Sequence, residues 1–528
     1  MTEGWDTRTT ALLQNLAGES VNSLAQRLAP GHLVIQVGGD ALASPQGQLL
    51  VSFAANLAGR LFPVVQRVTI VMPSDHKLLF SSPRWRDATF SGHLSMLLHA
   101  LPELVACSIS REPPATYDWA LVVGSEMGDV GHSTIFVGAD GWEASFSPDR
   151  PIAATGRKNP VGAYVAACIG IAEIWKRLLL PHGDIFHKAI IRPLMEPLTF
   201  SAFTYFVSPG PNPELPAAVT LGRVTGVGVG AGGGAAMFTL ASLEGARGHL
   251  NLIDPDEIEA SNLNRYVMAD TADVDERMNK AKLAARMFGP QVTVKPYPRS
   301  FSECDGLEPA DYGFVLAAVH TREARREIQW ETPGVLWDAG ATQDGDFRIW
   351  RMILGQTECM HCKHPPGAED VEYRKAAQLS KLLKLEHTVC LRKLRDNEIF
   401  TEAEAARIAG LVQDERLEFD PPRPQQRFGD WEAEQCGKLK LPELDEEVPI
   451  PFAPVMAGVL IAGEIIKEQH FPEYVLDSRY SNTLMGQFMR RSRPVRIAPK
   501  PDCKLCNDPL MHEQFRARAR SGQAPAHQ

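Results

Sequence analysis

Short apolar runs recur along the chain, and several of them end at a glycine-rich turn or at an aspartate. The clearest case is Val224–Leu243, where an apolar strand enters a run of glycines and continues as a helical pattern. The next apolar run, Leu250–Ile253, ends directly on Asp254. A strand, a glycine-rich turn and a helix followed by a second strand form the first part of a nucleotide-binding βαβ unit. The pattern therefore predicts an α/β fold of the Rossmann type.

The same pattern occurs twice. Four segments of the first half resemble four segments of the second half in the same order: His32–Asp40 and Arg223–Ala231, Val68–Pro73 and Leu250–Pro255, Asp118–Val123 and Asp311–Leu316, Asn159–Lys176 and Ile450–Lys467. The first three pairs lie about 190 residues apart, whereas the last pair lies about 290 apart. We therefore predict a duplicated sheet domain whose second copy has an insertion before its last helix.

Composition excludes some classes of protein. The 528 residues are 44% hydrophobic and 22% charged, as in ordinary globular proteins. A net charge of −10 argues against a nucleic-acid or membrane-surface partner. No charged segment followed by an apolar segment opens the chain, and the longest apolar run is too rich in glycine to span a membrane. We therefore expect a cytoplasmic protein.

The glycine-rich turn allows two registers of a phosphate-binding loop. Gly228, Gly230 and Gly233 give GxGxxG, whereas Gly230, Gly232 and Ala235 give GxGxxA. We prefer the second register for two reasons. Gly230 would then lie at the end of the strand, and an acid would follow about 20 residues later, at the position where an acid binds ribose in such folds. Asp254 is that acid.

Polar residues after this acid indicate a triphosphate rather than a dinucleotide. Asp256, Asn262, Arg265 and Lys280 follow Asp254 in order. Cations at these places can neutralise phosphates and stabilise charge during attack on one of them. The competing interpretation is that Arg265 and Lys280 are solvated charges on helices. A nicotinamide-dependent dehydrogenase is disfavoured, since it needs no such cluster.

Two Cys-x-x-Cys pairs predict a metal site. Cys359 with Cys362 and Cys503 with Cys506 supply four thiolates, which is the ligand set of a structural Zn²⁺. Such a site would tie segments more than 100 residues apart and suggests a reducing compartment. Four sulfur ligands leave no open position for catalysis.

On these motifs, the span from Val224 to about Lys467 resembles the adenylation domain of ubiquitin-activating (E1) enzymes and their ThiF/MoeB relatives. The resemblance implies that the loop with Gly230, Gly232 and Gly233 binds ATP together with Mg²⁺. It further implies that Asp254 holds the ribose and that Asn262, Arg265 and Lys280 surround the phosphates.

The sequence departs from the family pattern at two places. Tyr266 stands where the family has Gln. His320 in FVLAAVHTREAR replaces a family acid that lies near Mg²⁺ and the phosphates, while Arg325 is kept. The second departure puts the arrangement of the metal in question.

The first copy is expected to be inactive. Met72 occupies the position of Asp254, and the loop is reduced to Gly38 and Gly39 followed by Asp40. One inactive copy beside an active one is the arrangement of ubiquitin-type E1 enzymes, so a homo-oligomer is not required. In the family, an Arg from the partner copy's first helix reaches ATP. Arg8 is the match here, with a solvated surface Arg as the alternative.

The family places its thioester cysteine in the insertion, which contains Cys390 and Cys436. Cys436 lies shortly before the final helix and is followed by Gly and two Lys, which suit an exposed, activated thiol. Cys390 falls on an apolar helical face and is expected to be a small buried residue. Cys436 is therefore the preferred catalytic residue.

The expected architecture is α/β, with two ThiF-type adenylation domains in tandem. The inactive domain covers 1–200 and the active domain covers 201–365 and 449–510. A mainly helical catalytic-cysteine insertion covers 366–448, and a tail that we expect to be disordered covers 511–528.

The resemblance implies that the enzyme adenylates the C-terminus of a ubiquitin-like modifier, carries it as a thioester and passes it to an E2-like partner. The absence of room for an E2-recruiting ubiquitin fold after Cys506 favours the bacterial type, which belongs to ubiquitin-like conjugation operons tied to phage defence. The alternative is a ThiF/MoeB-like adenylyltransferase that acts on a sulfur-carrier protein without a thioester.

Overall fold

A computed structural model describes residues 12–13, 31–101, 104–125, 133–154, 156–183, 191–207, 211–342, 345–364, 369–414, 419–435, 450–486, 488 and 492–522. The chain divides into two compact units. The first unit comprises Met1–Lys363 and Val448–Gln528, and the second comprises His364–Glu447. No helix among the described residues is long and apolar enough to cross a membrane.

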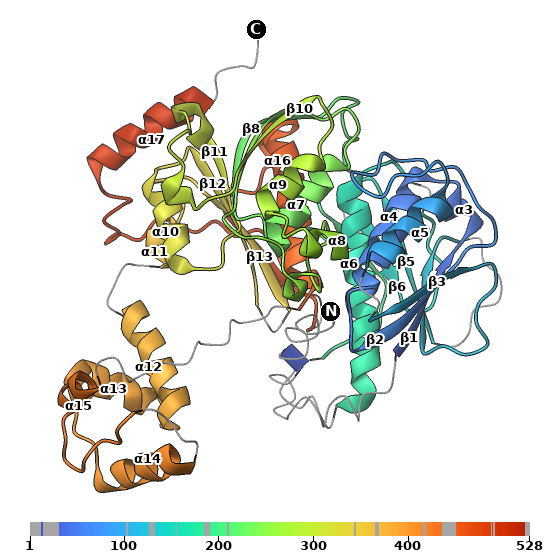
Figure 1. Ribbon diagram of the computed structural model, residues 1–528. Helices are drawn as coiled ribbons and strands as arrows, with labels where there is room; N and C mark the ends of the chain where they lie inside the picture. The colour runs from blue at the N-terminus through green and yellow to red at the C-terminus, as the bar shows by residue number, and fades with distance from the viewer. Residues whose placement is uncertain are drawn as a thin grey trace. The chain divides into compact units, whose positions relative to one another are not determined.

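The first unit contains two seven-stranded sheets with the same strand order (Figure 1). The first sheet runs in the order β3 (Ala106–Ser110), β2 (Val65–Val71), β1 (Gly31–Val37), β4 (Trp119–Val123), β5 (Thr134–Asp140), β6 (Glu143–Ser147) and β7 (Leu198–Ser201). The second runs in the order β10 (Val292–Tyr297), β9 (Arg247–Ile253), β8 (Thr220–Val227), β11 (Phe314–Ala317), β12 (Val335–Ala341), β13 (Asp346–Met352) and β14 (Arg479–Thr483). In each sheet the first five strands pair in parallel, and the sixth strand pairs antiparallel with both the fifth and the seventh. The predicted α/β class is confirmed.

The helices of the first unit connect these strands. Those of the first half are α3 (Gly39–Leu42), α4 (Pro45–Ala58), α5 (Phe90–Ala100), α6 (Pro160–Leu179) and the 3-10 helix η1 (Leu180–His182). Those of the second half are α7 (Ala231–Ala241), α8 (Thr271–Asp275), α9 (Lys280–Arg286), α10 (Arg322–Trp330), α11 (Met360–Lys363), α16 (Phe452–His470) and α17 (Pro509–Gly522), with the 3-10 helices η2 (Ala260–Asn262), η3 (Phe301–Glu303), η4 (Pro309–Tyr312) and η5 (Pro472–Tyr474).

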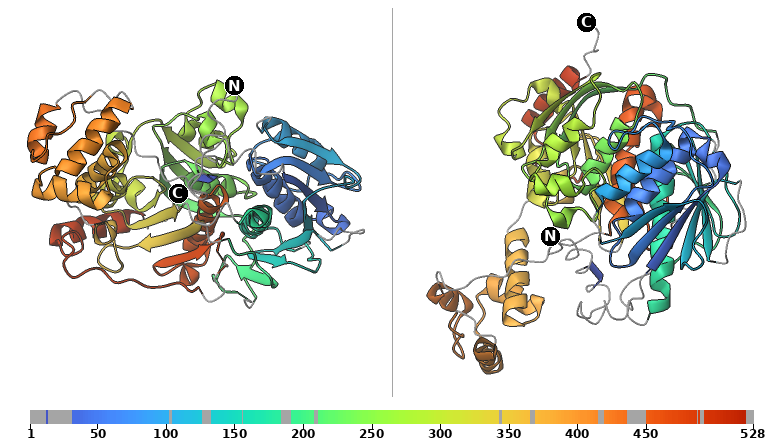
Figure 2. Two further views of the ribbon diagram at one scale, coloured as in Figure 1. Left: turned by 90° about the horizontal axis from the view of Figure 1, so that it is seen from below. Right: turned by 45° about the vertical axis from the view of Figure 1, so that its right-hand side comes forward.

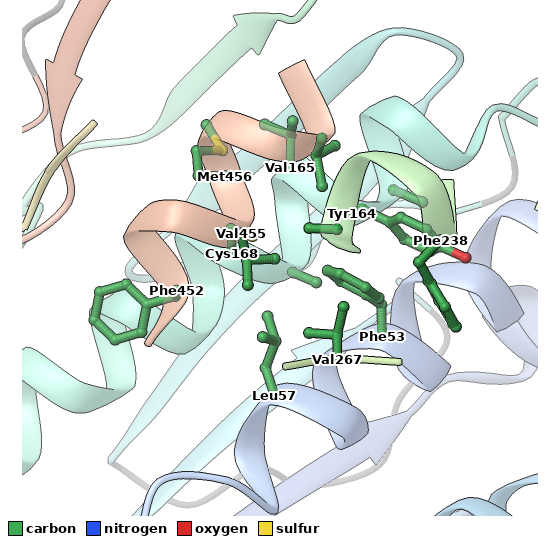
Figure 3. Close-up of a cluster of buried hydrophobic side chains, with 14 of the residues drawn as sticks. Phe53, Leu57, Tyr164, Val165, Cys168, Phe238, Val267, Phe452, Val455 and Met456 are labelled. Carbon is green, nitrogen blue, oxygen red and sulfur yellow. The ribbon is translucent and has the colours of Figure 1, made fainter. Parts of the chain in front are cut away.

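Helices α6 and α16 lie between the two sheets, as Figures 1 and 2 show. A buried apolar cluster joins the two halves there (Figure 3). The side chains labelled in Figure 3 come from α4, α6, α7, α16 and the segment after η2, and they are Phe53, Leu57, Tyr164, Val165, Cys168, Phe238, Val267, Phe452, Val455 and Met456. The halves therefore share one hydrophobic core.

Each of the two long helices also buries a Glu-Lys pair, and the two pairs occupy matching positions of the repeat. Glu173 pairs with Lys176 on α6, and Glu464 pairs with Lys467 on α16. Lys467 donates to the carbonyl oxygen of Phe203 at 2.9 Å, in the first half. Lys176 contacts the carbonyl oxygen of Gly486 at 3.4 Å, in the second half. Each half therefore supplies a buried lysine that contacts a backbone carbonyl oxygen of the other half.

The second unit is helical. It contains α12 (Glu369–Leu383), α13 (His387–Asp396), α14 (Glu402–Asp414) and α15 (Phe428–Glu434). Its own small core includes Leu379, Phe400, Ile408, Phe428 and Trp431.

Candidate functional site

The glycine loop lies between β8 and α7, and its geometry favours a different register from the one that we preferred on sequence. β8 ends at Val227, so Gly230 does not close the strand but caps α7. Gly228 has φ +85°, which suits a tight turn. A Cβ on Gly233 would lie 2.1 Å from the carbonyl oxygen of Gly228, whereas a Cβ on Gly230 would meet nothing within 4 Å. Turn, open approach and close packing are the three roles of GxGxxG, so Gly228, Gly230 and Gly233 form the motif.

Asp254 links this loop to the end of β9. Its Oδ2 accepts the backbone N–H of Val229 at 2.6 Å, and its Oδ1 accepts that of Asp256 at 2.9 Å. The side chain is buried, and burial raises the pKa of this carboxyl above its usual value. The carboxylate is therefore fixed beside the loop, with lone pairs left to accept hydrogen bonds from hydroxyl groups.

Helix α9 brings Lys280 to the acid pair. Lys280 Nζ lies 2.8 Å from Asp256 Oδ2, and the Lys280 side chain is only 12% exposed. The preceding residue, Asn279, caps α9 and donates from Nδ2 to the carbonyl oxygens of Asp254 and Asp256, at 2.9 Å each. Sequence reasoning missed Asn279. Its position as a cap directly before Lys280 was the available signal.

Asn262 is the last residue of η2, and Arg265 lies on the irregular segment that follows it. The Asn262 side chain accepts the backbone N–H of Glu259 at 3.2 Å and so shapes this turn. Arg265 is half-buried, and its Nη1 donates to Asn264 Oδ1 at 3.2 Å. The ring of Tyr266 is buried against Gly234, where a Cβ would lie 2.4 Å from Tyr266 Cε2. The departure from the family pattern at Tyr266 is therefore accommodated by a glycine on α7.

A buried acid on β12, Asp338, lies beside the end of β11. The family acid's position is taken by His320, which is exposed, but Asp338 on β12 pairs in register with Ala317. Arg325 Nε lies 2.7 Å from Asp338 Oδ1, and Lys363 Nζ lies 3.3 Å from Oδ2. Burial alone would raise the pKa of Asp338, but the charges of Arg325 and Lys363 hold it below its usual value. Sequence spacing could not find Asp338, because its link to β11 is a pairing between strands.

These residues do not fit a magnesium ion held by the protein as in the family pattern. Among the residues that the structure describes at this edge, Asp338 is enclosed by two cations and Asp254 accepts backbone N–H groups with both oxygens. Asp256 is already paired with Lys280. The cations at this edge outnumber the carboxylates that could serve a metal, so we derive no step through Mg²⁺.

The equivalent place in the first half is occupied by a side chain of the protein itself. Asp40 accepts the backbone N–H and the hydroxyl of Ser125, both at 2.9 Å. A Cβ on Gly124 would lie 2.4 Å from Asp40 Oδ1, so this carboxylate sits tightly against the end of β4. A fixed negative charge in this loop opposes the binding of a phosphate. Met72, buried at the end of β2, offers no acid for a ribose.

Arg8 lies outside the residues that the structure describes. Cys436 also lies outside them. Cys390 on α13 is buried in the core of the second unit, and burial raises the pKa of its thiol to about 11. A thiol of this kind is a poor nucleophile at neutral pH.

Four cysteines converge at α11 and the segment before α17. The Sγ atoms of Cys359, Cys362, Cys503 and Cys506 lie within 4.8 Å of one another, and all four residues are buried. Cys359 Sγ lies 3.6 Å from Cys362 Sγ, 3.7 Å from Cys503 Sγ and 3.3 Å from Cys506 Sγ. A tetrahedral zinc with Zn–S bonds of about 2.3 Å requires thiolates roughly 3.8 Å apart. The cluster therefore fits the predicted ligand set.

Two family models match the chain. Residues 218–505 match the ThiF family, and residues 32–190 match the BilD N-terminal domain. The uncharacterized protein y4jF of Sinorhizobium fredii (strain NBRC 101917 / NGR234) is 25% identical over 480 residues, which cover 88% of this chain and 86% of that protein.

Solved structures of E. coli MccB are also similar. MccB with ATP gives a TM-score of 0.31 at 16% identity, over 54% of this chain and 66% of the MccB chain. MccB alone gives 0.32 at 15% identity, over 55% and 66%. The ThiF match spans more than half of the sequence and includes the glycine loop, the acid pair and three of the four clustered cysteines, and it ends one residue before Cys506. The chain therefore belongs to the ThiF family of E1-like, ATP-dependent adenylyltransferases.

Proposed function

We propose that this protein activates the C-terminus of a ubiquitin-like modifier with ATP, carries it as a thioester on Cys436 and transfers it to an E2-like partner. One observation carries the proposal: a ThiF unit shares its chain with a second sheet of the same strand order and with an inserted helical unit. An adenylyltransferase that stops at the adenylate has no need of an inserted unit. The match at residues 32–190 supports a place among bacterial ubiquitin-like conjugation systems.

The first step is attack by the modifier's terminal carboxylate on the α-phosphorus of ATP. A carboxylate oxygen forms the new P–O bond, and the bond to the bridging oxygen breaks, so pyrophosphate leaves and an acyl-adenylate remains. In this proposal Gly230 lets the backbone approach the phosphates and Asp254 accepts from the ribose hydroxyls. Arg265 and Lys280 neutralise the phosphates during the displacement.

The second step transfers the acyl group to sulfur. The Cys436 thiolate attacks the acyl carbon, the C–O bond to AMP breaks, and AMP leaves with the electron pair. A thioester keeps the acyl group exchangeable for a second thiol on the E2-like partner. Cys390 is unsuited to this step, because its thiol is buried and its pKa is raised.

We also propose that Cys359, Cys362, Cys503 and Cys506 hold a structural Zn²⁺. The bound ion would tie α11 to the segment before α17. Lys363, which follows Cys362, reaches Asp338 beside the end of β11. The zinc-bound cysteines would thus hold Lys363, which is one cation of the proposed adenylation site.

The alternative is an adenylyltransferase that acts on a sulfur-carrier protein without a thioester. One experiment separates the two functions: the protein is mixed with candidate modifier proteins and ATP and analysed on gels with and without reductant. A thiol-sensitive adduct that requires ATP supports the proposal. Pyrophosphate release without an adduct supports the alternative, and the absence of both products with every candidate modifier contradicts both functions.

A further inference from the structure

The segment Leu263–Ala269, which carries Arg265, is held by side chains of the first half. It lies between η2 and α8 and forms neither helix nor strand. The carbonyl oxygens of Leu263, Val267, Met268 and Ala269 all accept hydrogen bonds from first-half side chains. A segment without regular structure depends on such partners to satisfy its buried backbone groups.

Arg60 joins the two ends of this segment. Its Nη1 donates to the carbonyl oxygen of Leu263 at 2.6 Å, and its Nη2 donates to that of Ala269 at 2.8 Å. Its Nε donates to Asn56 Oδ1 at 2.7 Å. Arg60 is 1% exposed, and no carboxylate among the described residues lies within ion-pair distance of it. Burial lowers the pKa of this guanidinium to about 9.

Asn56 and Arg84 also bind the Leu263–Ala269 segment. Asn56 Nδ2 donates to the carbonyl oxygen of Val267 at 2.9 Å. Arg84 Nη1 donates to the carbonyl oxygen of Met268 at 2.8 Å, and the same guanidinium forms ion pairs with Asp270 and Asp273. Asp270 and Asp273 cap α8, so Arg84 also fixes the exit of the segment.

We propose that Arg60, together with Asn56 and Arg84, positions the Leu263–Ala269 segment so that Arg265 meets the phosphates of ATP. The first half, which we expect to bind no nucleotide itself, then helps to shape the nucleotide site of the second half. Burying an unpaired guanidinium is costly unless acceptors surround it, and these acceptors are the two ends of the arginine-bearing segment. Arg60 is a positioning residue, because it acts through the segment and not on the nucleotide. This inference rests on the proposed ATP site.

The test measures equilibrium binding of ATP to the full chain by calorimetry, so no modifier is needed. Arg60→Met should weaken ATP binding about tenfold, because only a part of the free energy of the two lost hydrogen bonds to Leu263 and Ala269 acts on the placement of Arg265. Arg60→Lys, which can reach one carbonyl at a time, should lose less. The control is Arg177→Met, because Arg177 is also buried but its partners, Glu173 and Leu194, belong to the first half. This control should bind ATP like the wild type.

A double-mutant cycle separates positioning from general loss of structure. If Arg60 acts through Arg265, Arg60→Met should have little further effect on ATP binding in an Arg265→Ala background. Equal effects in both backgrounds would overturn the inference. If Arg60→Met does not fold, Asn56→Ala, which removes one bond to Val267, is measured in the same two backgrounds with the same expectations.

The outcomes distinguish this inference from the proposed function. If the wild type does not bind ATP, the proposed function fails. If the wild type binds ATP and both Arg60→Met and Asn56→Ala bind it equally well, only the inference fails.

Discussion

Asp254 and Arg265 act on different parts of the proposed ATP site. Asp254→Ala removes the ribose acceptor and the bond to Val229 that fixes the glycine loop. Arg265→Ala removes a charge expected at the phosphates. Each variant should reduce modifier-dependent ATP–pyrophosphate exchange by about 100-fold or more, because each removes a charge-assisted contact expected with ATP.

The control for this experiment is Arg247→Ala, an exposed residue at the opposite end of β9 from Asp254. It should exchange at the wild-type rate. Wild-type exchange in both Asp254→Ala and Arg265→Ala would mean that the nucleotide binds elsewhere.

His93 should make the stability of the chain depend on pH. It is fully buried between Ser52 Oγ, 2.7 Å from Nε2, and the carbonyl oxygen of Trp85, 2.5 Å from Nδ1. Burial lowers the pKa of His93 below 6.5. Below that pH the unfolded chain binds a proton that the folded chain resists, so stability falls as pH decreases, by up to about 1.4 kcal/mol per unit from this group.

Thermal unfolding between pH 7.5 and pH 5 measures this effect. His93→Gln, which cannot become charged, should be less stable at pH 7.5 but should show a shallower loss toward pH 5. An identical slope in the two proteins would assign the pH dependence to other groups.

At the scale of elements, the four-cysteine cluster joins α11 to the segment before α17. The purified, reduced protein should contain about one Zn²⁺ per chain. Cys359→Ser or Cys503→Ser should remove the metal and lower the unfolding temperature by several degrees, because a metal that binds only the folded chain stabilises it. Adenylation should be affected less than stability.

Metal analysis and thermal unfolding check this expectation, with Cys107→Ser as the control, since Cys107 lies on β3 outside the cluster. Fresh protein without zinc would show that the four thiols have another role.

Helices with strong apolar patterns were predictable, whereas the geometry of the glycine loop was not. The segments Asn159–Lys176 and Ile450–Lys467 became α6 and α16, because a helix buried on all sides needs an uninterrupted apolar sequence. The preferred register of the glycine motif was wrong, because the roles of Gly228 and Gly233 depend on a φ value and on a contact between backbone atoms. The spacing of the glycines in the sequence reveals neither the φ value nor the backbone contact.

At the scale of the whole molecule, the proposed two-step reaction predicts that its steps separate. Cys436→Ala should still release pyrophosphate but should form no thiol-sensitive adduct, because alanine offers no nucleophile. Cys390→Ala should keep both activities and lose about 1–2 kcal/mol of stability in the helical unit through the cavity that it leaves. Non-reducing gels and pyrophosphate release measure the two steps.

An adduct that persists in Cys436→Ala and disappears in Cys390→Ala would reverse the assignment. An adduct that persists in both variants would point to another acceptor thiol, such as Cys304, which directly follows η3.

The α/β class, the repeat, the acid pair and the two cysteine pairs were predictable from the sequence, because they depend on local periodicity and on residue types that few other sites use. Tertiary structure alone decided how distant residues combine. Asp338 lies beside Ala317 only because β11 and β12 pair, and Arg60 meets Leu263 and Ala269 only because the halves pack together. Strand pairing and interface contacts join residues that lie far apart along the chain, and no local pattern specifies them.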